Sequence, residues 1–193
     1  MEMEKLVSVC RSYRRFAPGV QVEISTLREL VSLARCVPSA ANRQPLKYVL
    51  SCSSAANDCI FQTLAWAAYL KDWPGPGPQE RPAAYIVILL DTNISQSADI
   101  DVGIVAQTIL LGATARGLGG CMFGAIKRDQ LALSLALPPH LQVALVLAIG
   151  KPIEVVVLEG LPADGSIKYY RDPDGTHHVP KRPLEELIQA TYG

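Results

Sequence analysis

The segment that organises the chain reads Pro38-Ser-Ala-Ala-Asn-Arg-Gln-Pro-Leu-Lys-Tyr-Val-Leu50. It follows a helical pattern and leads into a strand-like run. Ser39, Asn42 and Gln44 gather three polar side chains in six residues, bracketed by Pro38 and Pro45. The two prolines fix their own φ and bias the preceding residues away from helix. Such a loop can bring a flat, polar-edged ligand close to the backbone, although an ordinary surface turn has the same composition.

The residues on either side of this loop predict regular structure. Thr26-x-x-Glu29 has the form of a capping box, and helical spacing of apolar residues follows it as far as Ala34. Residues 48–51 form a short strand pattern, and residues 57–70 a helical one. We therefore expect a helix, the loop, a strand and a second helix in that order.

The middle of the chain predicts the core. Residues 84–90 and 143–149 are continuous apolar runs of strand length, which is typical of strands buried on both faces. Residues 99–116 form a long helix that is apolar nearly all round, so it should be buried or packed against a second subunit. Asp99 and Asp101 suit its positive N-terminal end, and Gly117 suits its C-terminal cap.

Composition limits the classes of function. The 193 residues fit one domain, 1–193, and 49% hydrophobic content allows a sizeable core. A net charge of zero disfavours a general nucleic-acid or membrane-surface binder. Five cysteines without a Cys-x-x-Cys disfavour a disulfide framework or a zinc site, and Cys36 and Cys121 are expected in the core. With no signal-peptide pattern and no long apolar run, we expect a cytoplasmic protein.

Two segments depart from this compact pattern. Residues 71–82 contain four prolines and two glycines, which predicts a flap near a pocket or an ordinary surface loop. Residues 151–193 are more polar and too long for a fraying tail. An arm wrapped on a partner subunit would explain them.

The sequence contains no nucleophile elbow, phosphate loop or H-E-x-x-H pattern. Four polar spots stand out instead: the basic cluster 11–15, the loop 39–44, the glycine pair 119–120 and the basic pair 181–182. A flavin mononucleotide (FMN) needs cationic and hydroxyl donors at its phosphate, amide or backbone donors at its ring edge, and small neighbours at its ring face. The four spots supply these groups, and such a cofactor carries the redox chemistry itself.

Five motifs together resemble the nitroreductase family of FMN-dependent oxidoreductases, in that family's order and spacing. They are Arg11-Ser-Tyr-Arg-Arg-Phe16, Pro38-Ser-Ala-Ala-Asn-Arg-Gln-Pro45, Asp101-Val-Gly-Ile-Val-Ala-Gln107, Gly117-Leu-Gly-Gly-Cys121 and Gly150-Lys-Pro152. The resemblance covers nearly the whole chain. It implies an α+β fold with three α/β/α layers around a central mixed sheet, and a homodimer that exchanges its C-terminal arm, 151–193, with FMN at the interface.

The resemblance also implies roles for particular residues. Arg11, Ser12 and Arg14 should hold the phosphate, the ribityl chain and the pyrimidine edge, and Lys181 and Arg182 should complete the phosphate site. The second FMN-binding loop corresponds to Pro38, Ser39, Ala40, Asn42 and Gln44, and serves the partner's flavin. Gly119 and Gly120 should place backbone donors near N5 and O4. The sequence departs from the family at Leu46, where tryptophan is frequent, and after Cys59, where an Asn-x-x-Lys pair is missing.

The implied activity is ping-pong reduction of nitroaromatic, quinone or similar acceptors by NAD(P)H, with hydride transfer through flavin N5. We assign no side chain as acid or base. A specialised chemistry of the family, flavin fragmentation or dehalogenation, is the alternative within enzymes. A flavin carrier or sensor without turnover, or an interaction module without flavin, are the alternatives outside them.

Overall fold

A computed structural model describes residues 2–193, and the chain divides into two compact units. The first unit runs to Ala65 and continues over Pro76–Ile153, and the second combines Trp66–Gly75 with Glu154–Gly193. The boundary between them falls inside the expected flap 71–82, and the second unit contains most of the expected arm 151–193. Each unit is described by itself.

The first unit is built on a four-stranded sheet. It contains β1 (Leu46–Ser51), β2 (Ala84–Asp91), β3 (Gly119–Phe123) and β4 (Leu141–Gly150) in the order β1-β2-β4-β3, with antiparallel pairing throughout. A parallel bridge between Ser12 and Gly120 adds mixed pairing beside β3. Every residue of β2 is buried, which confirms the prediction of central strands from the continuous apolar runs.

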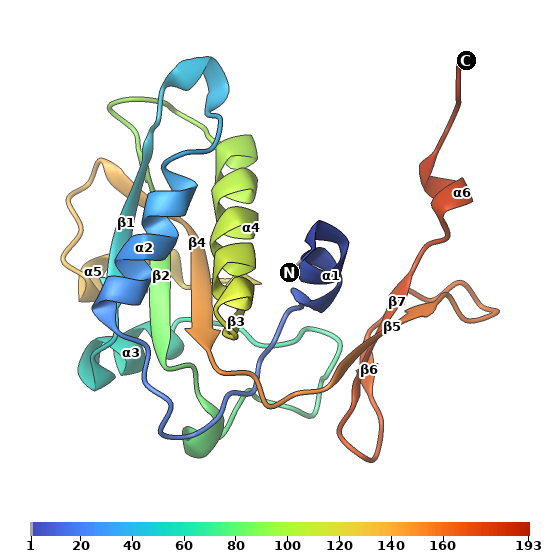
Figure 1. Ribbon diagram of the computed structural model, residues 1–193. Helices are drawn as coiled ribbons and strands as arrows, with labels where there is room; N and C mark the ends of the chain where they lie inside the picture. Colours follow the sequence, from blue (N-terminus) through green and yellow to red (C-terminus); the bar gives the residue numbers. More distant parts are fainter. Residues whose placement is uncertain (1) are drawn as a thin grey trace. The chain divides into compact units, whose positions relative to one another are not determined.

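Helices cover both faces of this sheet (Figure 1). On one face α2 (Ile24–Ala34) and α4 (Asp99–Ala115) enclose the main core with alternate residues of β2 and β4. On the other face lie α3 (Ser54–Phe61) and α5 (Arg128–Ser134), and α1 (Met3–Val9) packs beside α4. The expected α+β fold with three layers is therefore confirmed.

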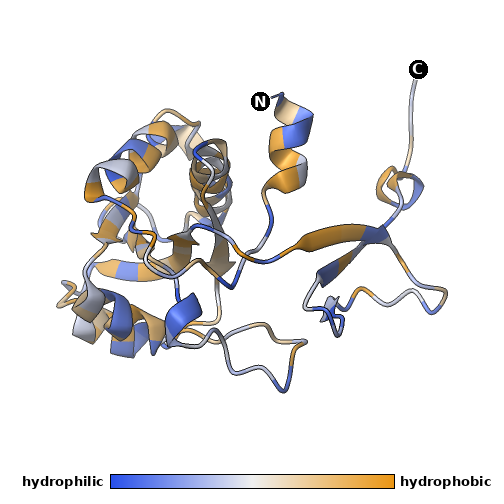
Figure 2. Ribbon diagram, turned by 60° about the horizontal axis from the view of Figure 1, so that its bottom comes forward, coloured by the Kyte–Doolittle hydropathy of each residue, from blue (hydrophilic) through white to orange (hydrophobic). Residues whose placement is uncertain are grey.

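Hydropathy follows these layers. The strands of the central sheet lie mostly in the hydrophobic colours of Figure 2.

Gly117 ends α4 as predicted, because its φ of 72° is left-handed and the Leu118 N–H reaches back to the Ala113 carbonyl at 3.0 Å. Over residues 2–193 no helix is both long enough and apolar enough to span a bilayer.

Two local predictions around α2 were wrong. α2 begins at Ile24 after Glu23, so Thr26 lies inside its first turn, and within the described chain no side chain caps this helix. The capping box at Thr26 is thus absent. Cys36 is exposed rather than in the core, because it lies in the turn after α2, whereas Cys121 is buried as expected.

The helix expected over 57–70 is the shorter α3. Ser53 caps it, since its hydroxyl accepts the Ala56 N–H at 3.4 Å, and the helix ends at Phe61. The chain then turns so that Leu64 pairs with Ile126 in an isolated β-bridge. A pairing with a distant segment therefore replaces the last two predicted turns of helix.

The second unit carries a three-stranded sheet that sequence patterns did not predict. Its strands β5 (Val156–Gly160), β6 (Tyr170–Arg171) and β7 (His177–Lys181) lie in the order β5-β7-β6. β5 runs parallel to β7, and β6 runs antiparallel to it. A turn after Asp172 connects β6 and β7, and the last helix is the short α6 (Leu184–Leu187).

Candidate functional site

The basic cluster 11–15 and the glycine pair 119–120 lie together in the first unit. After α1 ends, the chain becomes extended and the Tyr13 N–H donates to the Gly120 carbonyl at 2.9 Å. The Ser12–Gly120 bridge lies at the same place, and Phe16 pairs with Pro152 just beyond it. Two segments far apart in the sequence thus lie side by side, and residues 11–14 form a strip along β3, which we call the strip 11–14.

Packing explains why glycine occupies position 119. A Cβ atom there would lie 2.5 Å from Cγ of Pro152 and 2.6 Å from Cδ2 of Tyr13. At Gly120 a Cβ would collide with the Ala148 carbonyl oxygen. Neighbouring atoms of the chain therefore fill the space that these glycines leave, and close packing accounts for glycine at both positions.

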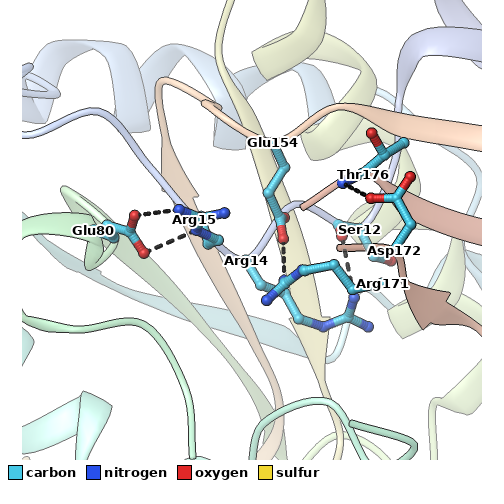
Figure 3. A network of polar contacts seen from close by, with 8 residues as sticks. All are labelled: Ser12, Arg14, Arg15, Glu80, Glu154, Arg171, Asp172 and Thr176. Atoms are coloured by element: carbon cyan, nitrogen blue, oxygen red, sulfur yellow. Dashed lines mark hydrogen bonds and ion pairs between the residues drawn. The ribbon is translucent and has the colours of Figure 1, made fainter. Parts of the chain in front are cut away.

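The arginines of this strip have different surroundings (Figure 3). Arg15 binds both carboxylate oxygens of Glu80, at 2.9 and 2.6 Å, so its charge is already paired. Arg14 is 9% exposed, and its Nη1 donates to the Ser12 carbonyl at 3.3 Å. Arg11 donates through Nη2 to the Val7 carbonyl at 2.6 Å, but its buried Nε finds no acceptor among residues 2–193. Arg11 thus has an N–H donor available for a ligand.

The loop 38–44 is strained. Its short 3₁₀ turn, η1 (Ala40–Asn42), and the residues after it include three non-glycine residues with a φ of 51°: Ala41, Asn42 and Gln44. A left-handed conformation costs an L-residue roughly 1 kcal/mol or more, with asparagine the most tolerant. Strain of this kind is typical of functional sites, provided that the surrounding structure holds it in place.

Asp101 holds the loop from the first turn of α4. Its Oδ2 accepts the Ser39 hydroxyl at 2.5 Å and its Oδ1 accepts the Ala40 N–H at 3.1 Å, while the carboxylate is almost fully buried. The Ser39 Oγ in turn accepts the Gln44 N–H at 2.9 Å. The Ser39 hydroxyl proton is therefore used inside the protein, and what this side chain can still offer a ligand is a lone pair.

The pKa of Tyr48 and the hydrogen bonds of Gln44 describe the surroundings of Asp101 and of the loop. Burial, followed by the negative charge of Asp101, raises the pKa of Tyr48. The Gln44 amide nitrogen donates to the Asn42 carbonyl and to its side-chain oxygen, at 3.1 and 3.0 Å. The patterns of the sequence identified Asp101 only as a helix-end charge and did not identify its bond to the loop.

The length of α4 separates the two halves of the predicted site. Asp101 and the loop 38–44 lie at the N-terminal end of this 17-residue helix, and Gly119–Gly120 follow its C-terminal end (Figure 1). A helix of this length extends about 25 Å at about 1.5 Å per residue. Within one chain, the loop and the strip 11–14 therefore lie at opposite ends of the unit.

The basic pair 181–182 belongs to the second unit. Lys181 ends β7 and is exposed. Arg182 forms an ion pair with Glu186 at 2.9 Å, and both side chains are about half exposed. An anion could replace this carboxylate at small cost, because exposed pairs of this kind contribute little stability.

Other groups of the second unit were not predicted from the sequence. Glu154, whose side chain is fully buried, binds Arg171 at 2.6 Å (Figure 3). The Arg171 guanidinium lies over the Trp73 ring, 4.7 Å from its centre. Trp73 also contacts Trp66 edge to face, and Tyr69 packs on Tyr169 at 4.9 Å. Tyr69 and Trp73 thus pack within this unit.

A sequence model of the Nitroreductase family matches residues 10–151. The chain belongs to the nitroreductase family. Solved structures share its fold. One is a nitroreductase family protein of Clostridium difficile 630, with a TM-score of 0.70, 19% identity and 98% coverage of both chains. Another is a Desulfovibrio desulfuricans nitroreductase solved with FMN, with a TM-score of 0.69, 22% identity, and 98% of this chain and 96% of that chain covered.

A third structural neighbour of this nitroreductase-family chain has a more specific description. It is CLA-ER, an enone reductase of gut-bacterial fatty acid saturation, with a TM-score of 0.66 and 20% identity. The similarity covers 79% of this chain and 89% of that one. At these identities the neighbours establish the fold, and the family model establishes the membership.

Proposed function

We propose that this nitroreductase-family protein is an FMN-dependent NAD(P)H oxidoreductase. The observation that carries the proposal is the strip along β3, where Arg11 keeps a buried Nε–H without an acceptor in the described chain, beside Ser12 and the buried Arg14. Guanidinium and hydroxyl donors suit the FMN phosphate and the polar edge of its ring. The FMN seen in the Desulfovibrio neighbour supports the same choice of cofactor.

The roles of the chain's own residues follow from their surroundings. Arg11, Ser12 and Arg14 would bind the anionic and polar parts of the cofactor, and Gly119 and Gly120 would offer backbone groups at its ring. Lys181 and Arg182 would add cationic donors. When bound, FMN supplies the hydride chemistry between NAD(P)H and a second substrate. No protein side chain is assigned as an acid or base.

A homodimer would bring the two halves of the site together. Because α4 separates them by about 25 Å in one chain, Ala40, Asn42 and Gln44 would serve a flavin held mainly by the other subunit. Ser39 would contribute through its backbone or a lone pair, and Pro38 through its backbone. Exposed apolar residues on the last segment, Leu184, Leu187 and Ile188, support an arm exchanged between subunits.

The second substrate would be a flat, electron-poor acceptor such as a nitroaromatic or a quinone. One structural neighbour is an enone reductase, so we include an enone in the same range of acceptors. We further infer a single functional domain over 1–193 and a cytoplasmic setting, where NAD(P)H is available.

Absorption spectroscopy tests this function directly. The purified protein should bind added FMN, the flavin band should bleach when NADPH or NADH is added without oxygen, and a quinone should restore it. Riboflavin, which lacks the phosphate, is the matched control ligand and should bind more weakly. Protein that stays colourless with added FMN would rule out the proposal, and bound flavin that neither nucleotide reduces would indicate a carrier or sensor instead.

A further inference from the structure

We propose that Asp101 is a positioning residue that holds the loop 39–44 in the conformation needed for cofactor binding. This inference deepens the proposed function and rests on it. Asp101 is not one of the residues predicted to contact the cofactor, but it contacts two that are, Ser39 and Ala40. It acts through its two hydrogen bonds, to the Ser39 hydroxyl and to the Ala40 N–H.

The two hydrogen bonds to Asp101 lie at the start of the strained turn. Ser39 and Ala40 begin the turn, and Gln44 ends it with a left-handed φ of 51°. The Gln44 N–H donates to the same Ser39 Oγ that donates to Asp101, so one chain of hydrogen bonds runs from α4 through Ser39 to the far end of the loop. Both ends of the strained segment are thereby tied to one buried carboxylate.

Side-chain packing beneath the loop is too loose to do the same work. An open pocket of about 230 Å³ adjoins it, lined by Val37, Pro38, Ser39, Gln44, Tyr48 and Val105 among others. Apolar contacts across such a space are incomplete, and close packing is what normally fixes a side chain or a turn. The turn has its own backbone hydrogen bonds, from the Asn42 N–H to the Ser39 carbonyl at 2.8 Å and from the Arg43 N–H to the Ala40 carbonyl at 3.1 Å, and the bonds to Asp101 are what tie this turn to the rest of the fold.

The position of Asp101 in α4 makes the restraint rigid. The residue lies in the first turn, where the helix dipole favours a carboxylate, and the helix behind it packs into the core through Val105 and Ile109. Asp99 lies in the same turn but is exposed, and across the described residues no hydrogen bond or ion pair joins it to the loop. Asp99 is therefore a matched control for loss of charge at this helix end.

The first test measures the loop without any cofactor. Amide hydrogen exchange at Ala40 and Gln44 should be slow in the wild-type protein and should accelerate in Asp101→Asn, because the two donors bond different carboxylate oxygens and asparagine replaces one of these oxygens by an NH2 group that cannot accept. Asp99→Asn should leave both rates unchanged. Exchange at Ala40 and Gln44 that is equally fast in all three proteins, or equally slow in all three, would overturn the clamp whether or not the protein binds FMN.

The second test measures FMN affinity by quenching of flavin fluorescence at a temperature where every variant is folded. Asp101→Asn and Ser39→Ala should each raise the Kd about tenfold, Asp99→Asn should change it less than about twofold, and the double variant should be no worse than either single variant. Additive effects, or an unchanged Kd in Asp101→Asn, would refute positioning through Ser39. Absence of FMN binding by the wild type would instead refute the proposed function and, with it, the role of Asp101 in cofactor binding.

Discussion

His178 Nε2 lies 3.2 Å from Oδ2 of Asp172, and Nδ1 of the same ring lies 3.0 Å from Oε2 of Glu159. Tyr170, which pairs with His178 across β6 and β7, stacks on the imidazole with its ring nearly parallel at 4.7 Å. A neutral imidazole has one N–H and can donate to one of these carboxylates, whereas the imidazolium donates to both. The geometry therefore favours the charged form of His178.

This arrangement predicts a pH-dependent stability of the second unit. The hydrogen bond to Asp172, then that to Glu159, raises the pKa of His178 above its usual 6.5, and the bond to His178 lowers the pKa of Asp172 below 3.8. A raised pKa contributes stability that is complete below 6.5 and is lost as the pH rises through the folded-state value. The lowered pKa of Asp172 reports the same bond, whose contribution is lost as the pH falls below 3.8.

Thermal unfolding of His178→Gln checks this prediction. The variant should have a lower Tm than the wild type near about pH 6, and the difference should shrink towards about pH 9 as the wild-type imidazole loses its charge. His140→Gln is the control, because this histidine lies outside the cluster and should show no such trend. A Tm difference that stays constant over this range would mean that the charge of His178 does not hold the hairpin.

Arg11 and Arg14 should be needed for FMN but not for assembly. Replacing either by alanine removes charge-assisted hydrogen bonds and should weaken FMN binding about ten- to a hundredfold, with the dimer intact by size-exclusion chromatography. Arg15→Gln is the matched control in the same strip, because Arg15 is already paired with Glu80 and should lose little affinity. Unchanged flavin occupancy in both alanine variants would refute the assignment of this strip.

The two ion pairs of the second unit should differ greatly in strength. Glu154→Gln leaves Arg171 without its buried partner, and breaking a buried pair costs about 3 kcal/mol or more of unfolding free energy. Glu186→Gln breaks the exposed pair with Arg182 and should cost less than about 1 kcal/mol. Urea denaturation of both variants measures the contrast, and equal costs would show that Glu154 is solvated in solution.

Prediction from the sequence was most successful where burial leaves a continuous pattern. The apolar runs of β2 and β4 and the long α4 were found because their surroundings are apolar on most sides. α3 was misplaced because its true signal is the cap at Ser53, and because its end is decided by the pairing of Leu64 with Ile126, which no local pattern records. The strands β5 to β7 are short and half exposed, so their alternation was too weak to detect.

The candidate site shows the same difference between features that have a local sequence pattern and contacts that only the fold creates. The strip 11–14 and the glycines at 119–120 were singled out because their motifs are local in the sequence; the fold brings them together, and their role in binding stays a prediction. The bond from Ser39 to Asp101 joins residues 62 positions apart, and only the fold brings them together. One signal was available: Asp101 lies four and eight residues before Val105 and Ile109, on the buried stripe of α4, and a carboxylate on such a stripe needs a partner.

Ala41 offers a test of the strained loop that is independent of any ligand. Its φ of 51° and ψ of 24° are unfavourable for alanine by roughly 1 kcal/mol or more, and glycine removes this cost. Glycine also loses more entropy on folding, by about 0.5–1 kcal/mol, so Ala41→Gly should be neutral or slightly stabilising. Ala40 lies next to Ala41 and has an ordinary negative φ. Ala40→Gly therefore loses the same entropy on folding but relieves no backbone strain. Urea denaturation should therefore place Ala41→Gly above Ala40→Gly by about 1 kcal/mol, and equal destabilisation by the two changes would show that the left-handed turn does not persist in solution.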